Sequence, residues 1–194
     1  ICSGLVGSEM CIRDRWFTAR QRRAIVAEAR SARAAQNLYE DTPENGANDA
    51  DALSKSIKKI VRQAAIRTND LDRSFFEQAL ADGVSDTEYV EIIGVVARSL
   101  SVDVFARGMG LSLRELPAPE PEDRDGEPNQ HRPTTAIDEK AWVNTVPGGR
   151  RGGDDAIFIY GSNRVEVAAF IYKALSLVPE EAKGLVSLGG AQYM

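Results

Sequence analysis

Residues 79–91, ALADGVSDTEYVE, predict two helices joined by a tight turn. Gly83 is placed to end the first helix, because glycine readily adopts the left-handed conformation that often follows a helix. Ser85 and Glu88 have the spacing of a capping box, in which each side chain binds the backbone N–H of the other residue at a helix start. The stretch therefore predicts a helix–turn–helix unit.

The second helix of this unit is predicted to be the longest in the chain. Val84 and Tyr89 flank its start with the spacing of a hydrophobic staple. Apolar residues recur at helical spacing from there to about Arg107, and Gly108 and Gly110 then end the pattern.

Three helices are predicted before the turn, the last of which is the first helix of the helix–turn–helix unit. Apolar residues at helical spacing indicate amphipathic helices over residues 51–67 and 70–81. Thr18 and Gln21 repeat the capping-box pattern and start a helix that runs to about Ala35. Helices on both sides of the turn favour an all-α fold.

Two polar stretches interrupt the helices. Residues 39–49 are rich in Asp, Asn, Glu, Pro and Gly and predict a loop. Residues 117–161 begin with alternating prolines and acids and keep no apolar period, so we expect a linker or an extended wrapping arm. Trp142 and Val143 favour an arm that docks on the rest of the protein, because a free linker rarely carries a large aromatic side chain. A loop is the alternative.

The last part of the chain, 162–194, is predicted to form a helical pair. Asn163 and Glu166 mark the start of a helix that runs through Leu175. Pro179 is placed as the first residue of the next helix, where its missing N–H costs nothing.

The first fifteen residues, ICSGLVGSEMCIRDR, resemble translated DNA-sequencing adapter, and we set Ile1–Arg15 aside from the fold. Both cysteines, Cys2 and Cys11, lie in this stretch. The remaining residues therefore offer no disulfide, thiolate metal site or cysteine nucleophile. The stretch has no long apolar run of a signal peptide, and the chain has no transmembrane run, so we expect a cytoplasmic protein.

Charge argues against a nucleic-acid partner. The net charge is −5, which disfavours binding to phosphate backbones. The helix after the turn would also present Asp86, Glu88 and Glu91 to a DNA groove. The helix that starts at Thr18 is basic, but glutamate and alanine interleave with its arginines, so we expect a solvated face. These arginines are Arg20, Arg22, Arg23, Arg30 and Arg33.

The carboxylates on the longest helix all have simple structural interpretations. Glu88 is explained by helix capping. We expect Glu91 to be solvated, or paired with Arg98 or with a residue of the arm. Asp103 and Arg107 are four positions apart, which predicts a local ion pair.

Other candidate sites are weak. His131 is the single histidine and lies in the Pro-rich arm, where we expect an exposed side chain. Residues 148–153, GGRRGG, lack the Lys-Ser/Thr ending of a phosphate loop and predict a flexible loop. The spacing of metal ligands is absent, so we expect no metal and no cofactor.

The turn resembles that of the alkylhydroperoxidase D-like and carboxymuconolactone decarboxylase superfamily, in its peroxidase-related, two-repeat branch. Residues 79–91 look like the Ala-x-x-x-Gly-x-Ser-x-x-Glu turn between the family's active-site helix and the next helix. Residues 75–110 are similar in helix order and length, and 174–180 look like the start of a second repeat. The resemblance implies a degenerate helical repeat over 16–116, an arm over 117–161 and the first helices of a second repeat over 162–194.

The chain departs from this family at its catalytic motif. The family carries Cys-x-x-Cys-x-x-x-His, and the matching positions here are Thr68, Leu71 and Phe75. Peroxide reduction needs a thiolate that attacks the peroxide and a second thiol that resolves the sulfenic acid, and these residues supply neither. The resemblance therefore implies no catalytic residue in this repeat.

The resemblance also implies what the intact gene product would do. It would be a peroxide-reducing or related oxidoreductase and a homo-oligomer, acting on a small peroxide or lactone-type substrate only if a complete second repeat exists. The alternative is a non-catalytic helical module for oligomerisation or scaffolding.

Overall fold

The computed structural model describes residues 15–39, 51–116, 128, 130–161 and 169–192. Helices are the regular elements of these residues, together with one isolated antiparallel bridge between Ile137 and Thr145. The predicted all-α class is confirmed.

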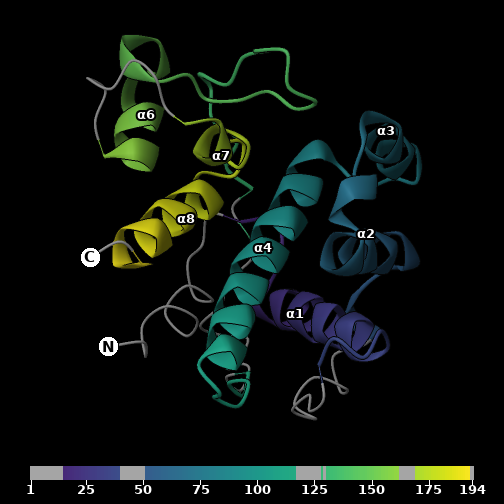
Figure 1. Cartoon of the computed structure of the whole chain (residues 1–194). Coiled ribbons are helices and arrows are strands. Elements are labelled where there is room, and N and C mark those ends of the chain that lie inside the picture. The colour runs from purple at the N-terminus through teal and green to yellow at the C-terminus, as the bar shows by residue number, and fades with distance from the viewer. Residues whose placement is uncertain (1–14, 40–50, 117–127, 129, 162–168, 193–194) are drawn as a thin grey trace.

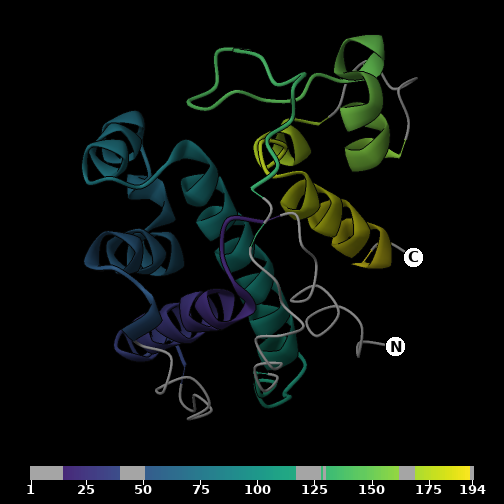
Figure 2. The same cartoon turned by 180° about the vertical axis from the view of Figure 1, so that it is seen from behind.

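A single long helix, α4, organises the rest. It runs through the middle of the molecule, with α1, α2 and α3 on one side and α6, α7 and α8 on the other (Figure 1). Figure 2 shows the same division from behind. The helices span Ala19–Ala34 (α1), Lys55–Ile66 (α2), Arg73–Ala81 (α3), Asp86–Gly108 (α4), Gly153–Tyr160 (α6), Phe170–Lys173 (α7) and Pro179–Gln192 (α8), with 3₁₀ turns at Thr68–Asp70 (η3) and Gly149–Gly152 (η4).

Both predicted capping boxes are confirmed. At the start of α4, the Ser85 N–H donates to Glu88 Oε2 at 2.8 Å, and the Glu88 N–H donates to Ser85 Oγ at 3.2 Å. Thr18 and Gln21 make the same reciprocal pair at the start of α1. In each capping box, the two side chains satisfy backbone N–H groups that would otherwise be unpaired at the helix start.

Two helices begin later than predicted because polar side chains cap them. Ser54 accepts a hydrogen bond from the backbone N–H of Ile57, so α2 begins at Lys55 and not near residue 51. Asp72 accepts one from the N–H of Phe75 at 2.8 Å, so α3 begins at Arg73 and not at Asp70. In both places the cap overrides the apolar period that extends further upstream.

The larger core cluster lies where α1, α2 and α4 meet, with α3 packed at its edge. Apolar side chains from all four helices meet there and exclude water. Its largest fully buried apolar side chains are Ile25, Ile60, Val61, Ile92 and Val96.

A second, smaller core cluster covers the opposite side of α4. It joins α4 to α6, α8 and the arm, and it contains Val90, Val146, Ala156, Ile159, Leu175, Leu177, Val178 and Ala182. The arm therefore docks, as the aromatic residue in it predicts: Trp142 stacks on Phe76 with ring centroids 6.5 Å apart. The prediction of one irregular arm over 117–161 is wrong, since it contains η4 and α6.

The C-terminal helical pair is only partly as predicted. Pro179 does begin α8. The helix that we expect from Asn163 through Leu175 is, in the described residues, the single turn α7, because the chain leaves helical structure after Lys173. Its residues 163–168 lie outside the described part, as do most of the predicted loop 39–49 and residues 117–127.

None of the described helices combines the length and the apolar run that crossing a membrane would require.

We expect Gly83→Ala to destabilise the fold. Gly83 has φ +88°, a left-handed conformation that costs an L-residue about 1–2 kcal/mol. Urea denaturation should show this loss in the free energy of unfolding. Gly108→Ala is the matched control: a side chain there meets open space and the backbone is not left-handed, so stability should not fall. Equal losses in the two variants would contradict the assignment of Gly83 as the turn residue.

Candidate functional site

A buried ionic centre lies where α1, α4 and α8 meet. Arg22 of α1 donates to Glu91 of α4 and lies 2.8 Å from an oxygen of Glu181 of α8. Arg98 lies two turns after Glu91 on α4, and its Nη2 atom is 2.5 Å from the other carboxylate oxygen of Glu181. Both carboxylates are fully buried. The prediction of a solvated Glu91 is therefore wrong, since Arg22 is its partner from another helix.

The start of the described chain also contributes to this centre. The backbone N–H of Trp16 donates to Glu91 Oε2 at 2.7 Å. Arg15, the last residue of the adapter-like stretch, is 2 % exposed. Burial and the nearby charge of Arg22 lower the pKa of Arg15 to about 10. The residues of that stretch before Arg15 lie outside the described part.

The pKa values of the two carboxylates shift in opposite directions. Burial raises the pKa of Glu91, and the attraction of Arg22 only partly offsets this. Burial acts on Glu181 in the same direction, but Arg22 and Arg98 outweigh it and hold the pKa of Glu181 below its ordinary value. Glu181 is therefore the firmly ionised carboxylate of the pair.

Gly94 lets α8 approach α4 at this point. A Cβ atom on Gly94 would lie 2.7 Å from Oε2 of Glu181, closer than real Cβ contacts allow. The glycine lies one helical turn after Glu91, on the same face. The absence of a side chain therefore makes room for the carboxylate.

A second buried ion pair joins α1 to the C-terminal half of α4. Arg30 donates from Nε and Nη2 to the two oxygens of Asp103, at 2.9 and 2.7 Å, and from Nη1 to the carbonyl of Arg114 at 2.8 Å. The spacing on α4 predicts a local ion pair between Asp103 and Arg107. Such a pair does not account for the burial of the Asp103 carboxylate, which has Arg30 of α1 as its partner. The bidentate geometry suits the planar guanidinium group.

The predicted solvated face of α1 is therefore wrong for three of its arginines. Arg22, Arg23 and Arg30 are 4, 7 and 7 % exposed. The acidic partners of Arg22 and Arg30 on α4 lie 69 and 73 positions away in the sequence. Composition of the helix alone does not reveal partners at that separation.

Beside the ionic centre, an apolar pocket of about 310 Å³ opens between the α3–α4 unit, the arm and the end of α7. Its three aromatic walls are in contact: Phe76 meets Tyr89 edge to face at 5.0 Å and stacks on Trp142. The pocket is lined by Leu71, Phe76, Tyr89, Val90, Ile93, Ala141, Trp142, Val143, Ala174 and Leu175.

The three positions that match the family's catalytic motif do not share one helix. Thr68 is exposed on η3, Leu71 lies between η3 and α3, and Phe75 is in the first turn of α3. The cap at Asp72 separates the first two from the third. Leu71 is the one of the three that lines the pocket.

The remaining predicted candidates lie at exposed or structural positions. His131 is exposed on the arm, as predicted, and Glu88 is the capping residue of α4. The flexible loop predicted over 148–153 is wrong: the segment forms η4 and enters α6, and a Cβ on Gly152 would lie 2.1 Å from the carbonyl oxygen of Pro147. In the described part of the chain, no group of three or more His, Cys, Asp or Glu side chains could hold a metal ion.

Comparisons with models of protein families, with curated proteins and with solved structures gave no match. The resemblance to the alkylhydroperoxidase D-like superfamily therefore stays a prediction from the residues.

Sequence reasoning missed the ionic centre and the pocket. A partial signal exists, because Glu91, Gly94 and Arg98 fall on one face of a helix that is otherwise apolar there. A charged residue on such a face indicates a buried partner. The identities of the partners, Arg22 for Glu91 and Glu181 for Arg98, have no local signal.

We expect Glu181→Gln to cost far more stability than Glu91→Gln. Removing the Glu181 charge leaves Arg22 and Arg98 buried with one carboxylate fewer, a loss of about 3–5 kcal/mol by analogy with other broken buried pairs. Glu91→Gln removes a charge that burial already disfavours, so its cost at neutral pH should be smaller. Urea denaturation at pH 7 measures both; equal costs would contradict the assignment.

The pH dependence gives an independent check. The lowered pKa of Glu181 contributes stability that is present above the pKa of the unfolded chain, about 4.3, and is lost as the pH falls through the folded value. The raised pKa of Glu91 acts oppositely and removes stability as the pH rises through its folded value. Compared with the unmodified chain, Glu181→Gln should therefore lose less free energy of unfolding as the pH falls below about 4.3. Glu91→Gln should lose less as the pH rises above about 4.3.

Proposed function

We propose that the chain is the non-catalytic helical part of an alkylhydroperoxidase D-like, peroxidase-related oxidoreductase that works in the cytoplasm. The turn around Gly83 and Ser85 supports the family, since its capping box and left-handed glycine form as the family pattern requires. The substitutions at the motif support the non-catalytic role.

One observation carries this proposal. Thr68, Leu71 and Phe75 hold no thiol and no base, and a helix break at Asp72 separates the first two positions from the third. A thiol peroxidase needs its nucleophile, resolving thiol and base close together. The repeat therefore contributes its fold and not its chemistry.

The ionic centre fits such a structural role. Arg22, Glu91 and Glu181 join α8 to α1 and α4. The C-terminal segment, 162–194, would continue into a second repeat that holds the working thiols. A peroxide or lactone-type substrate belongs to that second repeat.

A thiol-dependent peroxidase assay tests the first half of the proposal. With hydrogen peroxide and dithiothreitol, the Cys2→Ser/Cys11→Ser variant should consume peroxide no faster than buffer, because no cysteine remains. The unmodified chain is the control that measures any background from those two thiols. Turnover by the cysteine-free variant would overturn the non-catalytic assignment.

Reading the gene from an independent DNA library tests the second half. We expect the open frame to continue beyond codon 194 and to encode a helical repeat with Cys-x-x-Cys, or with one Cys followed by His. A stop directly after codon 194 would overturn the family proposal and favour the alternative module.

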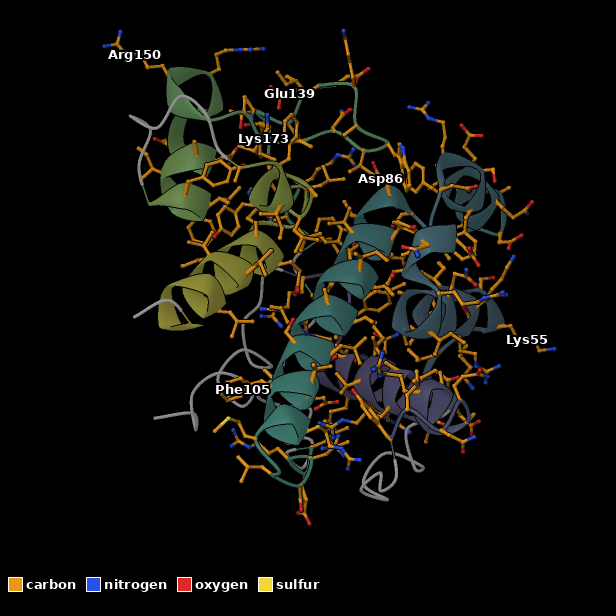
Figure 3. The ribbon with its side chains drawn as sticks, in the orientation of Figure 1. Lys55, Asp86, Phe105, Glu139, Arg150 and Lys173 are labelled. Carbon is orange, nitrogen blue, oxygen red and sulfur yellow. The ribbon has the colours of Figure 1, made fainter. Side chains whose placement is uncertain are left out.

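That alternative, a helical oligomerisation module, has one observation of its own. The C-terminal end of α4 exposes a group of large apolar side chains, and Phe105 lies at this end (Figure 3). They are Val104, Phe105, Met109 and Leu111, of which Phe105 is 64 % exposed. Exposed apolar groups of this kind are typical of protein–protein contacts.

We expect Phe105→Lys to lower the oligomeric state of the chain if this surface is the contact. Sedimentation velocity over a range of concentrations measures the change. Phe170→Lys is the matched control, because Phe170 is 79 % exposed on α7, which lies near the N-terminal end of α4 and away from Phe105. An oligomer that survives Phe105→Lys, or one that both variants disrupt equally, would contradict a contact specific to the end of α4.

A further inference from the structure

The pocket beside α4 has the properties of a small-molecule site. Its volume of about 310 Å³ lies in the range of ligand pockets. The walls come from α3, α4, the arm and the end of α7, so the folded chain holds them in place together. Such a pocket is formed before any ligand arrives.

The walls favour an aromatic ligand. Phe76, Tyr89 and Trp142 supply three rings, and the Phe76 and Trp142 planes are inclined by only 25°. Trp142 is 43 % exposed despite its size. A ring placed against Trp142 would gain both apolar burial and stacking.

The charges around the pocket favour a neutral ligand. None of the lining residues carries a formal charge. An ion placed there would lose its water without gaining a partner, which is costly. Burial and the negative charge of the Asp72 carboxylate raise the pKa of Tyr89. This carboxylate would repel an anion in particular.

One polar group is available to orient the ligand. Burial and Asp72 raise the pKa of Tyr89 to about 12, so its hydroxyl stays protonated at neutral pH and can donate. Tyr89 supplies the one hydroxyl group of the lining, whose other polar side-chain atom is the indole nitrogen of Trp142, and no described residue forms a hydrogen bond with the Tyr89 hydroxyl. This hydroxyl can donate a hydrogen bond to an acceptor oxygen of a ligand.

We propose that this pocket binds a small neutral aromatic molecule with one hydrogen-bond acceptor, its ring against Phe76 and Trp142 and its acceptor oxygen on the Tyr89 hydroxyl. The inference rests on the geometry of the pocket and not on the family proposal. A peroxidase-negative chain can therefore still bind such a ligand.

The test uses the full chain and three matched probes. 2-Acetylnaphthalene is neutral and carries a carbonyl acceptor, 2-ethylnaphthalene lacks the acceptor, and 2-naphthoate is anionic. Saturable quenching of tryptophan fluorescence measures binding. We expect 2-acetylnaphthalene to bind most tightly and 2-naphthoate most weakly. The absence of saturable binding, or tightest binding by 2-naphthoate, would overturn the proposal.

Two variants place the binding in the pocket. Ala174 is exposed at the rim, so Ala174→Phe should fill the pocket without disturbing the core and should weaken 2-acetylnaphthalene binding at least tenfold. Ala97→Phe is the control, since Ala97 is exposed on α4 outside the pocket. Far-ultraviolet circular dichroism checks that both variants fold. Equal affinity in wild type and Ala174→Phe would place the ligand elsewhere and overturn the proposal.

Tyr89→Phe separates the hydrogen bond from the apolar contacts. It keeps the ring and removes the donor, so the affinity for 2-acetylnaphthalene should fall about threefold to tenfold, the size of one net hydrogen bond. The affinity for 2-ethylnaphthalene should not change. Equal losses for both probes would overturn the role of the hydroxyl as the orienting donor.

Discussion

The structure depends on one guanidinium group, that of Arg22, which lies buried between the carboxylates of Glu91 and Glu181. A buried charge is tolerated only when it is paired, so this arginine requires both α4 and α8 to be in place. Gly94 allows the close approach of Glu181, which fixes how far α8 can slide along α4. Apolar contacts alone would tolerate several registers of two packed helices. The ionic centre allows far fewer registers of α8 on α4. It thereby sets the position of the C-terminal segment against the helix–turn–helix unit.

The features that the sequence predicted are those with local signals. The capping boxes at Thr18 and Ser85 involve residues three positions apart, and Gly83 acts through its own backbone.

The errors in the predictions also have physical reasons. Polar caps shifted two helix starts. Residues 117–161 looked irregular because α6 is short, and its apolar residues form one continuous run without helical spacing. The buried arginines of α1 were assigned to solvent because their partners come from distant parts of the chain. Long-range pairing of charges leaves no periodic pattern to read.

The first turns of α4 serve three purposes at once. Tyr89 lines the pocket, Val90 belongs to the second core cluster as well as the pocket, and Glu91 enters the ionic centre. Consecutive residues on a helix point in different directions, about 100° apart, so neighbouring side chains can meet different surroundings. The turn before α4 sets the direction in which this short segment runs. The helix–turn–helix unit thereby positions the candidate ligand site within the fold. The arm completes the pocket from outside by placing Trp142 over Phe76.

The ionic centre also bears on how the chain folds during synthesis. Arg22 is among the first described residues to leave the ribosome, whereas Glu181 is among the last. Until Glu181 has been made, Arg22 has at most one of its two carboxylates, and α1 carries an excess of positive charge that disfavours burial. The helices around the turn can form early through their local signals. Their packing around Arg22 is complete only once the C-terminal segment supplies Glu181.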